Sequence, residues 1–436
     1  MPDWNGSYAQ FRLNFEQQGK RAKELLKAAR AGDPEALARF KSPPKLAEAQ
    51  YLIAKELRFD NWAALKRHTA EMTRAYEAMN ASAIDGDVRT LHVRCGHDLQ
   101  ESLKEAGFSG DYYVDIYPYL FGPVSEGPGC LEQRARHIVD CYGDDFDPPL
   151  EYEGQLRALE DKERDLHASA DYERVVLWFE HDCTDQLSLI HLLGHYAIHR
   201  RPARLELINI GDFPGGRRFT GLGELPPEAL RMLWKNRKPV SAAQLQLGLE
   251  AWRALANPDP RPLASIMRSG TRALPLLARA LYRHLSELPS IVNGLSLTEE
   301  LALTLMAEPL PDWDGTVNLR EIYWTMHWDT DPLPGQGDGH WLRRIVGMEA
   351  ASARVFTRSP GVDREERSHP SGTDVVVITE LGRSVLRGEV DFRSLNPPTR
   401  WVGGVEIGAG LRDWRWDERI KDTVCLDGPH SQRDKH

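Results

Sequence analysis

The sequence lacks long apolar runs and paired cysteines. No apolar run reaches the roughly 20 residues needed to cross a bilayer, and the start, MPDWNGSYAQ, has neither the basic nor the apolar region of a signal peptide. The five cysteines are odd in number, widely scattered and form no C-x-x-C pair, so the pattern indicates neither a disulfide framework nor a zinc knuckle. We therefore predict a cytoplasmic protein with reduced thiols and no membrane association.

Common catalytic motifs are also missing. The chain contains no G-x-S-x-G, Walker A or H-E-x-x-H motif and no Cys-His nucleophile arrangement, which disfavours the commonest hydrolases and NTPases. Gly221-x-Gly223 continues to Pro226 rather than to a third glycine, so it does not match a dinucleotide-binding loop, and the sequence leaves the cofactor unknown. The net charge of -10 disfavours nucleic acid as a partner, because phosphate binding relies on an excess of Lys and Arg.

A chain of 436 residues is long enough for two to four domains. The turns and helix ends that Pro and Gly indicate, together with the hydrophobic periodicity, divide the sequence into successive parts. We expect an α/β fold with added all-α parts. Its parts are an N-terminal helical module (residues 1–80), a Rossmann-like domain with a mostly parallel sheet (91–225), a helical region (226–294), a winged-helix-like unit with a terminal β-hairpin (295–425) and a flexible tail (426–436).

The first 80 residues read as short helices joined by turns. GDPEAL supplies a helix stop, an N-cap at Asp33 and Pro34 at the first helical position. The module loosely resembles an ankyrin-like helical leader, although no repeat of about 33 residues recurs. With no grouped reactive residues, it suits packing or a protein partner better than chemistry.

Strands and helices alternate after residue 90. Apolar strands are expected at 91–96, 111–118, 174–181 and 203–211, with helical patterns between them. The third of these, RVVLWFEH, is apolar almost throughout rather than alternating, which is typical of a parallel sheet buried on both faces. This order predicts the Rossmann-like domain.

Acids and histidines follow the strands of this predicted sheet. Because ligands bind outside the carboxyl ends of parallel strands, these side chains are expected to share one crevice with a small-molecule ligand. The candidate catalytic residues are His97, Asp98, Asp115, Glu180, His181 and Asp182. Asp98 and Asp185 also stand where helix N-caps belong, and Glu180 and His181 suit a site or a surface equally well.

Three histidines, His191, His195 and His199, recur every four residues and so form one stripe on the predicted helix. A pair at this spacing can bind a metal ion, but three residues span too much helix for one ion and no further ligand is placed by the sequence. We therefore predict no metal site, with His191 and His195 as the nearest candidates. The histidines are expected to face mostly water.

Five strings, in this order, resemble the bacterial family labelled domain of unknown function eighteen-thirty-five, with its usual C-terminal companion: LHVRCGHDLQESLKEAG, VVLWFEHDCTDQLSLIHLL, FTGLGELPPEAL, LARALYRHLSELPSIVNGLSLTEELAL and ITELGRSVLRGEVD. The resemblance covers residues 91–395 and implies relatives with the same layout, but the label assigns no activity. This chain reads Gly96-His97-Asp98 where the family typically has Gly-Asp directly after the first strand.

These observations favour an enzyme that acts on a small polar or phosphorylated ligand by acid–base chemistry at the carboxyl edge of the sheet. His97 and His181 could move protons, because imidazole side chains ordinarily titrate near neutrality, and clustered carboxylates shift one another's pKa. The alternatives are a ligand-sensing regulatory or protein-interaction protein with a winged-helix module, and a maturation partner that acts through residues 1–80.

Overall fold

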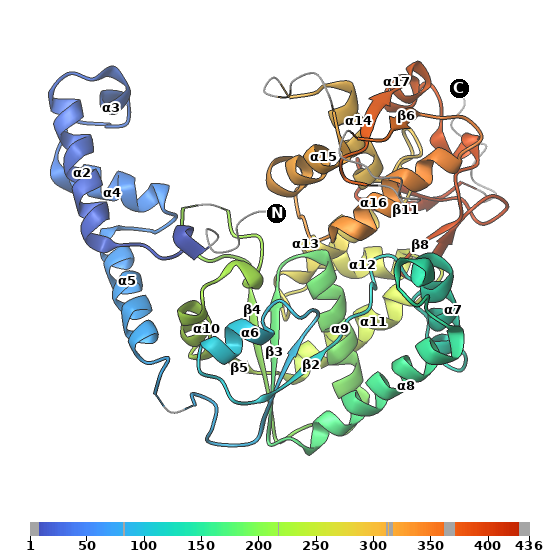
Figure 1. Ribbon diagram of the computed structural model, residues 1–436, viewed down its shortest axis with the longest axis horizontal. Coiled ribbons are helices and arrows are strands. Elements are labelled where there is room, and N and C mark those ends of the chain that lie inside the picture. Colours follow the sequence, from blue (N-terminus) through green and yellow to red (C-terminus); the bar gives the residue numbers. More distant parts are fainter. Residues whose placement is uncertain are drawn as a thin grey trace. The chain divides into compact units, whose positions relative to one another are not determined.

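The computed structural model describes residues 8–81, 83–216, 218–310, 313, 317–361 and 371–426 (Figure 1). The chain divides into two compact units. Unit 1 comprises Met1–Asp115, Ala168–Glu180 and Arg201–Val240, and unit 2 comprises Ile116–His167, His181–Arg200 and Ser241–His436. The consecutive domains expected from the sequence stay a prediction. The predicted tail, residues 426–436, lies outside the described residues except for Leu426.

Unit 1 begins with short helices. They are η1 (Tyr8–Gln10), α2 (Phe15–Arg30), α3 (Pro34–Ala38), α4 (Leu46–Glu56) and α5 (Trp62–Glu77). The predicted start of α3 is confirmed, because the Asp33 side chain accepts a hydrogen bond from the Ala36 N–H and Pro34 is the first helical residue. A small core of buried Ala22, Ile53 and Leu65 joins these helices.

A five-stranded sheet forms the centre of unit 1. Its strands are β1 (Thr90–Arg94), β2 (Asp111–Val114), β3 (Arg174–Glu180), β4 (Arg204–Ile210) and β5 (Lys238–Pro239). The order is β2-β1-β3-β4-β5, with the first four strands parallel and β5 antiparallel to β4. The four predicted strands are therefore confirmed. Because they run in one direction, the carboxyl ends of β1 and β3 lie at one edge of the sheet (Figure 1).

Two helices of unit 1, α6 (Gln100–Glu105) and α10 (Pro227–Trp234), complete its core. Buried aromatic residues, among them Phe108, Trp178 and Trp234, fill the space next to the sheet. His92 lies in the same group, where its Nε2 is 3.0 Å from Asp85 and the Trp178 indole N–H donates to its Nδ1 at 3.1 Å. The polar atoms of this aromatic core are thus paired inside it.

Unit 2 is mainly helical and ends in hairpins. Its helices are α7 (Cys130–Tyr142), α8 (Tyr152–Ala168), α9 (Cys183–Ile198), α11 (Ala242–Leu255), α12 (Arg261–Ser269), α13 (Leu277–Leu285), α14 (Leu297–Ala307), α15 (Leu319–Thr325), α16 (Asp338–Gly347) and α17 (Glu380–Leu386). Its antiparallel pairs are β6 (Phe356–Ser359) with β7 (Val375–Ile378), β8 (Arg400–Val402) with β9 (Val405–Ile407), and β10 (Trp414–Asp417) with β11 (Asp422–Cys425). The chain is therefore an α/β protein with added helices, as expected.

Helix α9 is buried on almost every side, and it approaches α11 closely. A Cβ at Gly248 of α11 would lie 2.4 Å from the Cβ of Leu193, so only glycine allows this distance. His191 and His195 are each 8% exposed. The expectation that the histidines of this helix mostly face water is therefore wrong for both, and it holds for His199 alone.

The fold also bears on the expected reduced thiols and on the expected lack of a membrane-spanning segment. The five cysteines all lie within the described residues, and none is disulfide-bonded. Among the described residues, no helix combines the length and the apolar character required to span a membrane.

Unit 2 is expected to lose stability in mild acid because of His284 in α13. This side chain is 1% exposed, and burial lowers its pKa from 6.5 to about 4. The unfolded chain then binds the proton more tightly than the folded chain, so stability falls as the pH drops from 6.5 toward 4, by roughly 3 kcal/mol in all. In His284→Leu this part of the decline should disappear when unfolding in urea is measured across that range.

The control is His97→Leu, which changes an exposed histidine of unit 1 and should leave the decline intact. Buried carboxylates act in a lower window: Glu287, whose pKa is lowered to about 2, loses its contribution only below about pH 4.5. An unchanged decline between pH 6.5 and 4.5 in His284→Leu would contradict the assignment.

Candidate functional site

At the carboxyl edge of the sheet, Arg94 joins two of the predicted site residues. Arg94 ends β1 and is 3.1 Å from Glu180 at the end of β3. Its Nη2 also donates to Asp98 at 3.0 Å. The side chains of Arg94 and Glu180 are 4% and 6% exposed, and that of Asp98 is 37% exposed. The expected convergence of Asp98 and Glu180 is therefore found, through an arginine that the sequence had not singled out.

Two glycines lie against these carboxylates. A Cβ at Gly221 would stand 2.7 Å from Glu180 Oε1, and one at Gly223 would stand 2.9 Å from Asp98 Oδ2. The N–H of Leu222, between them, donates to Glu180 Oε2. The Gly-Leu-Gly spacing thus has a structural reason: the backbone of this segment lies directly on the two carboxylates.

The other unit 1 candidates take different positions. His97 is exposed, and its Nδ1 is 3.3 Å from Gln100 Oε1. Asp115 is 5% exposed and extends the pairing of β2, since its N–H donates to the Arg94 carbonyl at 2.8 Å. Their predicted catalytic roles stay predictions.

His181 and Asp182 belong to unit 2, and each is 6% exposed. Asp182 is the N-cap of α9, because its Oδ1 accepts from the Asp185 N–H at 2.9 Å. The alternative that made Asp98 and Asp185 the N-caps is therefore wrong. Asp185 already lies inside the first turn of α9, and α6 begins after Leu99 without a side-chain cap.

The two nearest metal candidates also have different surroundings. His191 Nδ1 is 2.9 Å from the hydroxyl of Tyr119. His195 instead lies beside His199 and a histidine of α8, His167, at ring-centroid distances of 4.7 and 4.8 Å.

A pocket of about 350 Å³ lies within unit 2, in residues that the sequence had not grouped. It is formed by the end of α7, by α16 and by the segment from 392 to 401. We call it the arginine pocket, since four arginines line it. Its lining residues are Phe121, His137, Asp140, Cys141, Tyr142, Gly294, Glu299, His340, Arg343, Arg344, Gly347, Met348, Phe392, Arg393, Pro397, Pro398, Thr399, Arg400 and Trp401.

The guanidinium groups of the arginine pocket are only partly compensated. Within the described residues, Arg344 Nε, Arg393 Nε and Arg400 Nη1 are buried without a hydrogen-bond partner. Arg344 lies 3.7 Å from both Glu299 and Glu287, and Arg400 lies 3.8 Å from Glu299, distances beyond hydrogen bonding.

Burial lowers the pKa of Arg400, and the neighbouring Arg344 lowers it further. Burial also lowers the pKa of Arg393. The lining contains four arginines and two carboxylates, Glu299 and Asp140, while Arg343 also pairs with Asp145 and Arg344 lies 3.7 Å from Glu287. The pocket is therefore suited to an anion, whose oxygens would satisfy the unpaired N–H groups.

His340 gives the same pocket a group that can move a proton. Its ring stacks on Phe121 at 4.9 Å, and its Nδ1 is 3.0 Å from the hydroxyl of Tyr142. Burial and the nearby Arg343 lower the pKa of His340. It is therefore held neutral near pH 7, and a neutral imidazole can accept a proton.

One sequence signal points to this pocket, the pair Arg343 and Arg344 on a single helix. Arg393 and Arg400 follow about 50 residues later in a segment rich in proline, and no local pattern connects them to that helix. No known family model matches the chain, and no curated protein matches it. The family resemblance stays a prediction.

Glu180 is expected to be essential for the stability of unit 1. In Glu180→Ala the buried Arg94 loses a carboxylate and the Leu222 N–H loses its acceptor, so unfolding should become easier by about 3 kcal/mol. The matched control is Asp98→Ala, which removes the more exposed partner of the same arginine and should cost about 1 kcal/mol or less.

Chemical denaturation of the two variants and the wild type provides the measurement. If Glu180→Ala unfolds at the wild-type denaturant concentration, the contacts of Glu180 are dispensable, and a catalytic role becomes the better explanation of its position.

Proposed function

We propose that the protein binds a small phosphorylated or carboxylated ligand in the arginine pocket of unit 2. The observation that carries the proposal is the set of buried guanidinium N–H groups on Arg344, Arg393 and Arg400 that have no hydrogen-bond partner among the described residues. An unsatisfied buried donor costs about 1–3 kcal/mol, and more when it is charged. An anionic oxygen that accepts from these groups removes this cost.

The rest of the lining constrains the ligand. A volume of about 350 Å³ lies within the range of small-molecule sites, which begins near 300 Å³. Phe121, Trp401 and the adjacent Pro397 and Pro398 provide apolar walls beside the arginines. These walls suit a ligand with an anionic end and a planar or apolar body. This is the ligand class expected from the sequence, at another place in the fold.

Acid–base chemistry, the predicted activity, has a suitable group in the same pocket. His340 is a candidate general base, and Tyr142 holds its ring through the 3.0 Å contact. At the sheet edge of unit 1, by contrast, Glu180 and Asp98 both face Arg94, an arrangement that serves stability. An enzyme acting in the arginine pocket through His340 is therefore our second candidate function.

The regulatory alternative rests on the winged-helix interpretation. The order α14, α15, α16 and then the hairpin of β6 and β7 agrees with such a unit. Arg343 and Arg344 on α16 are the basic residues that a DNA-reading helix would present. Arg343 pairs with Asp145, however, and the side chain of Arg344 is only 10% exposed. We therefore favour ligand sensing over DNA binding for this unit, and a protein partner of residues 1–80 stays a prediction.

Binding of inorganic pyrophosphate, inorganic phosphate or citrate should raise the melting temperature of the protein, because an anion that binds the folded state stabilises it. Calorimetric titration of the tightest of the three should show roughly tenfold or greater weakening in Arg344→Gln and in Arg393→Gln, since each variant loses a charged hydrogen bond worth about 1.5–3 kcal/mol.

Arg253→Gln, which changes an exposed arginine on α11, is the matched control and should bind as the wild type does. The melting temperature of each variant without anion shows whether it folds. The proposal fails if none of the three anions binds, or if folded Arg344→Gln and Arg393→Gln bind as tightly as Arg253→Gln.

A further inference from the structure

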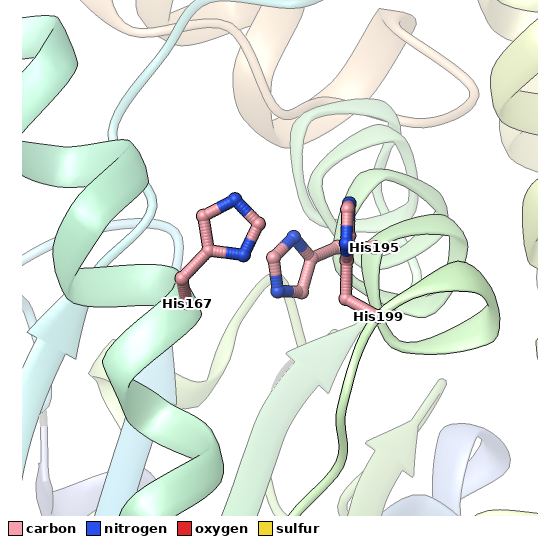
Figure 2. Close-up of side chains that lie close together, drawn as sticks. All are labelled: His167, His195 and His199. Atoms are coloured by element: carbon pink, nitrogen blue, oxygen red, sulfur yellow. The ribbon is translucent and has the colours of Figure 1, made fainter.

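The imidazole rings of three histidines of unit 2 lie close together (Figure 2). His167 comes from the last turn of α8, His195 from the last turn of α9, and His199 directly follows α9. The ring centroids are 4.8 Å apart for His167 and His195, 4.6 Å for His167 and His199, and 4.7 Å for His195 and His199. The three rings thus form a nearly equilateral triangle.

This triangle has the dimensions of a metal site. One ring nitrogen from each histidine lies within 4.8 Å of the other two. Around a tetrahedral ion with metal–nitrogen distances of 2.0–2.1 Å, the nitrogens are about 3.4 Å apart, so each pair needs to close by at most about 1.4 Å. His167 and His199 are exposed and His195 is buried, so the two outer side chains can rotate toward the fixed inner one.

The residue types also favour a metal ion. His195 and His199 are four residues apart and therefore neighbours on one helix face, and His167 provides the third ligand from another helix. Three neutral imidazoles suit Zn²⁺ and its neighbours in the transition series, and carboxylate-preferring Mg²⁺ and Ca²⁺ much less. When protonated, rings this close would repel one another, and a bound metal ion keeps them neutral.

We propose that His167, His195 and His199 bind one transition-metal ion, with Zn²⁺ as the best match, and leave its fourth position to water or to a ligand oxygen. Such an ion ties the end of α8 to the end of α9. The prediction of no metal site rested on the lack of a further ligand, and His167, 28 positions before His195 in a highly charged helix, is that ligand. This site shares no residue with the arginine pocket and does not rest on the proposed function.

The test uses the full chain without a polyhistidine tag, stripped of metal by a chelator. Zn²⁺ is titrated in competition with a chromophoric chelator, and Co²⁺ binding is followed by visible absorption, whose intensity reports tetrahedral geometry. We expect one ion per chain and a higher melting temperature with Zn²⁺. His167→Ala and His199→Ala change exposed side chains, so they should fold as the wild type does while binding Zn²⁺ at least tenfold more weakly.

His97→Ala removes an exposed histidine of unit 1 and is the matched control, expected to keep wild-type affinity. Zn²⁺ binding that is unchanged in both His167→Ala and His199→Ala overturns the site, and so does a wild type that binds no ion in the competition. Both variants should bind pyrophosphate with wild-type affinity. A failure of the proposed metal site can therefore be distinguished from a failure of the proposed anion site in the arginine pocket.

Discussion

Buried guanidinium groups in unit 2 share a small set of carboxylates, and the proposed anion site depends on this constraint. Arg283 is 3% exposed, and its guanidinium donates to Asp331 through three contacts, the shortest of them 2.8 Å, and also to Glu287. Glu287 also accepts from Thr298, and Glu299 accepts from the Ser296 N–H in the capping box of α14. Glu287 and Glu299 are therefore already engaged, and N–H groups of Arg344, Arg393 and Arg400 are left without a hydrogen-bond acceptor among the described residues.

The sheet edge of unit 1 shows the opposite balance. There one arginine, Arg94, faces two carboxylates, Glu180 and Asp98, and the backbone N–H of Leu222 also donates a hydrogen bond to Glu180. A polar cluster in which every member has a close partner rigidifies the fold and gains little from a ligand. The sheet edge of unit 1 and the arginine pocket of unit 2 both contain arginines and carboxylates. They differ in the ratio of the two, and this difference is why we assign stability to the first and ligand binding to the second.

The parts of the fold that could be predicted are those determined locally. The apolar run before Glu180 and the Asp33-Pro34 helix start are encoded within a few residues, and the structure confirms both. The parallel sheet then brought Asp98 and Glu180 to one edge, as expected. The role of Arg94 was missed because an arginine within an apolar strand gives no pattern of its own. The arginine pocket and His167 were missed because their partners are brought together only by tertiary packing.

The histidines of α9 show why periodicity alone misled. A spacing of four residues indicates one helix face, but it does not say which face meets water. Helix α9 is apolar on nearly all sides, and a helix of this kind is buried whatever its polar residues are. Buried histidines must then be satisfied inside the fold, as His191 is by Tyr119. His195 is held at the protein interior while His199 reaches the surface, and this change of environment along one face is what lets a residue of α8 complete a set of three nitrogens. In the sequence, three histidines of one stripe span too much helix to bind a single ion. The proposed site avoids this difficulty, because it uses only His195 and His199 of that stripe, together with His167 of α8.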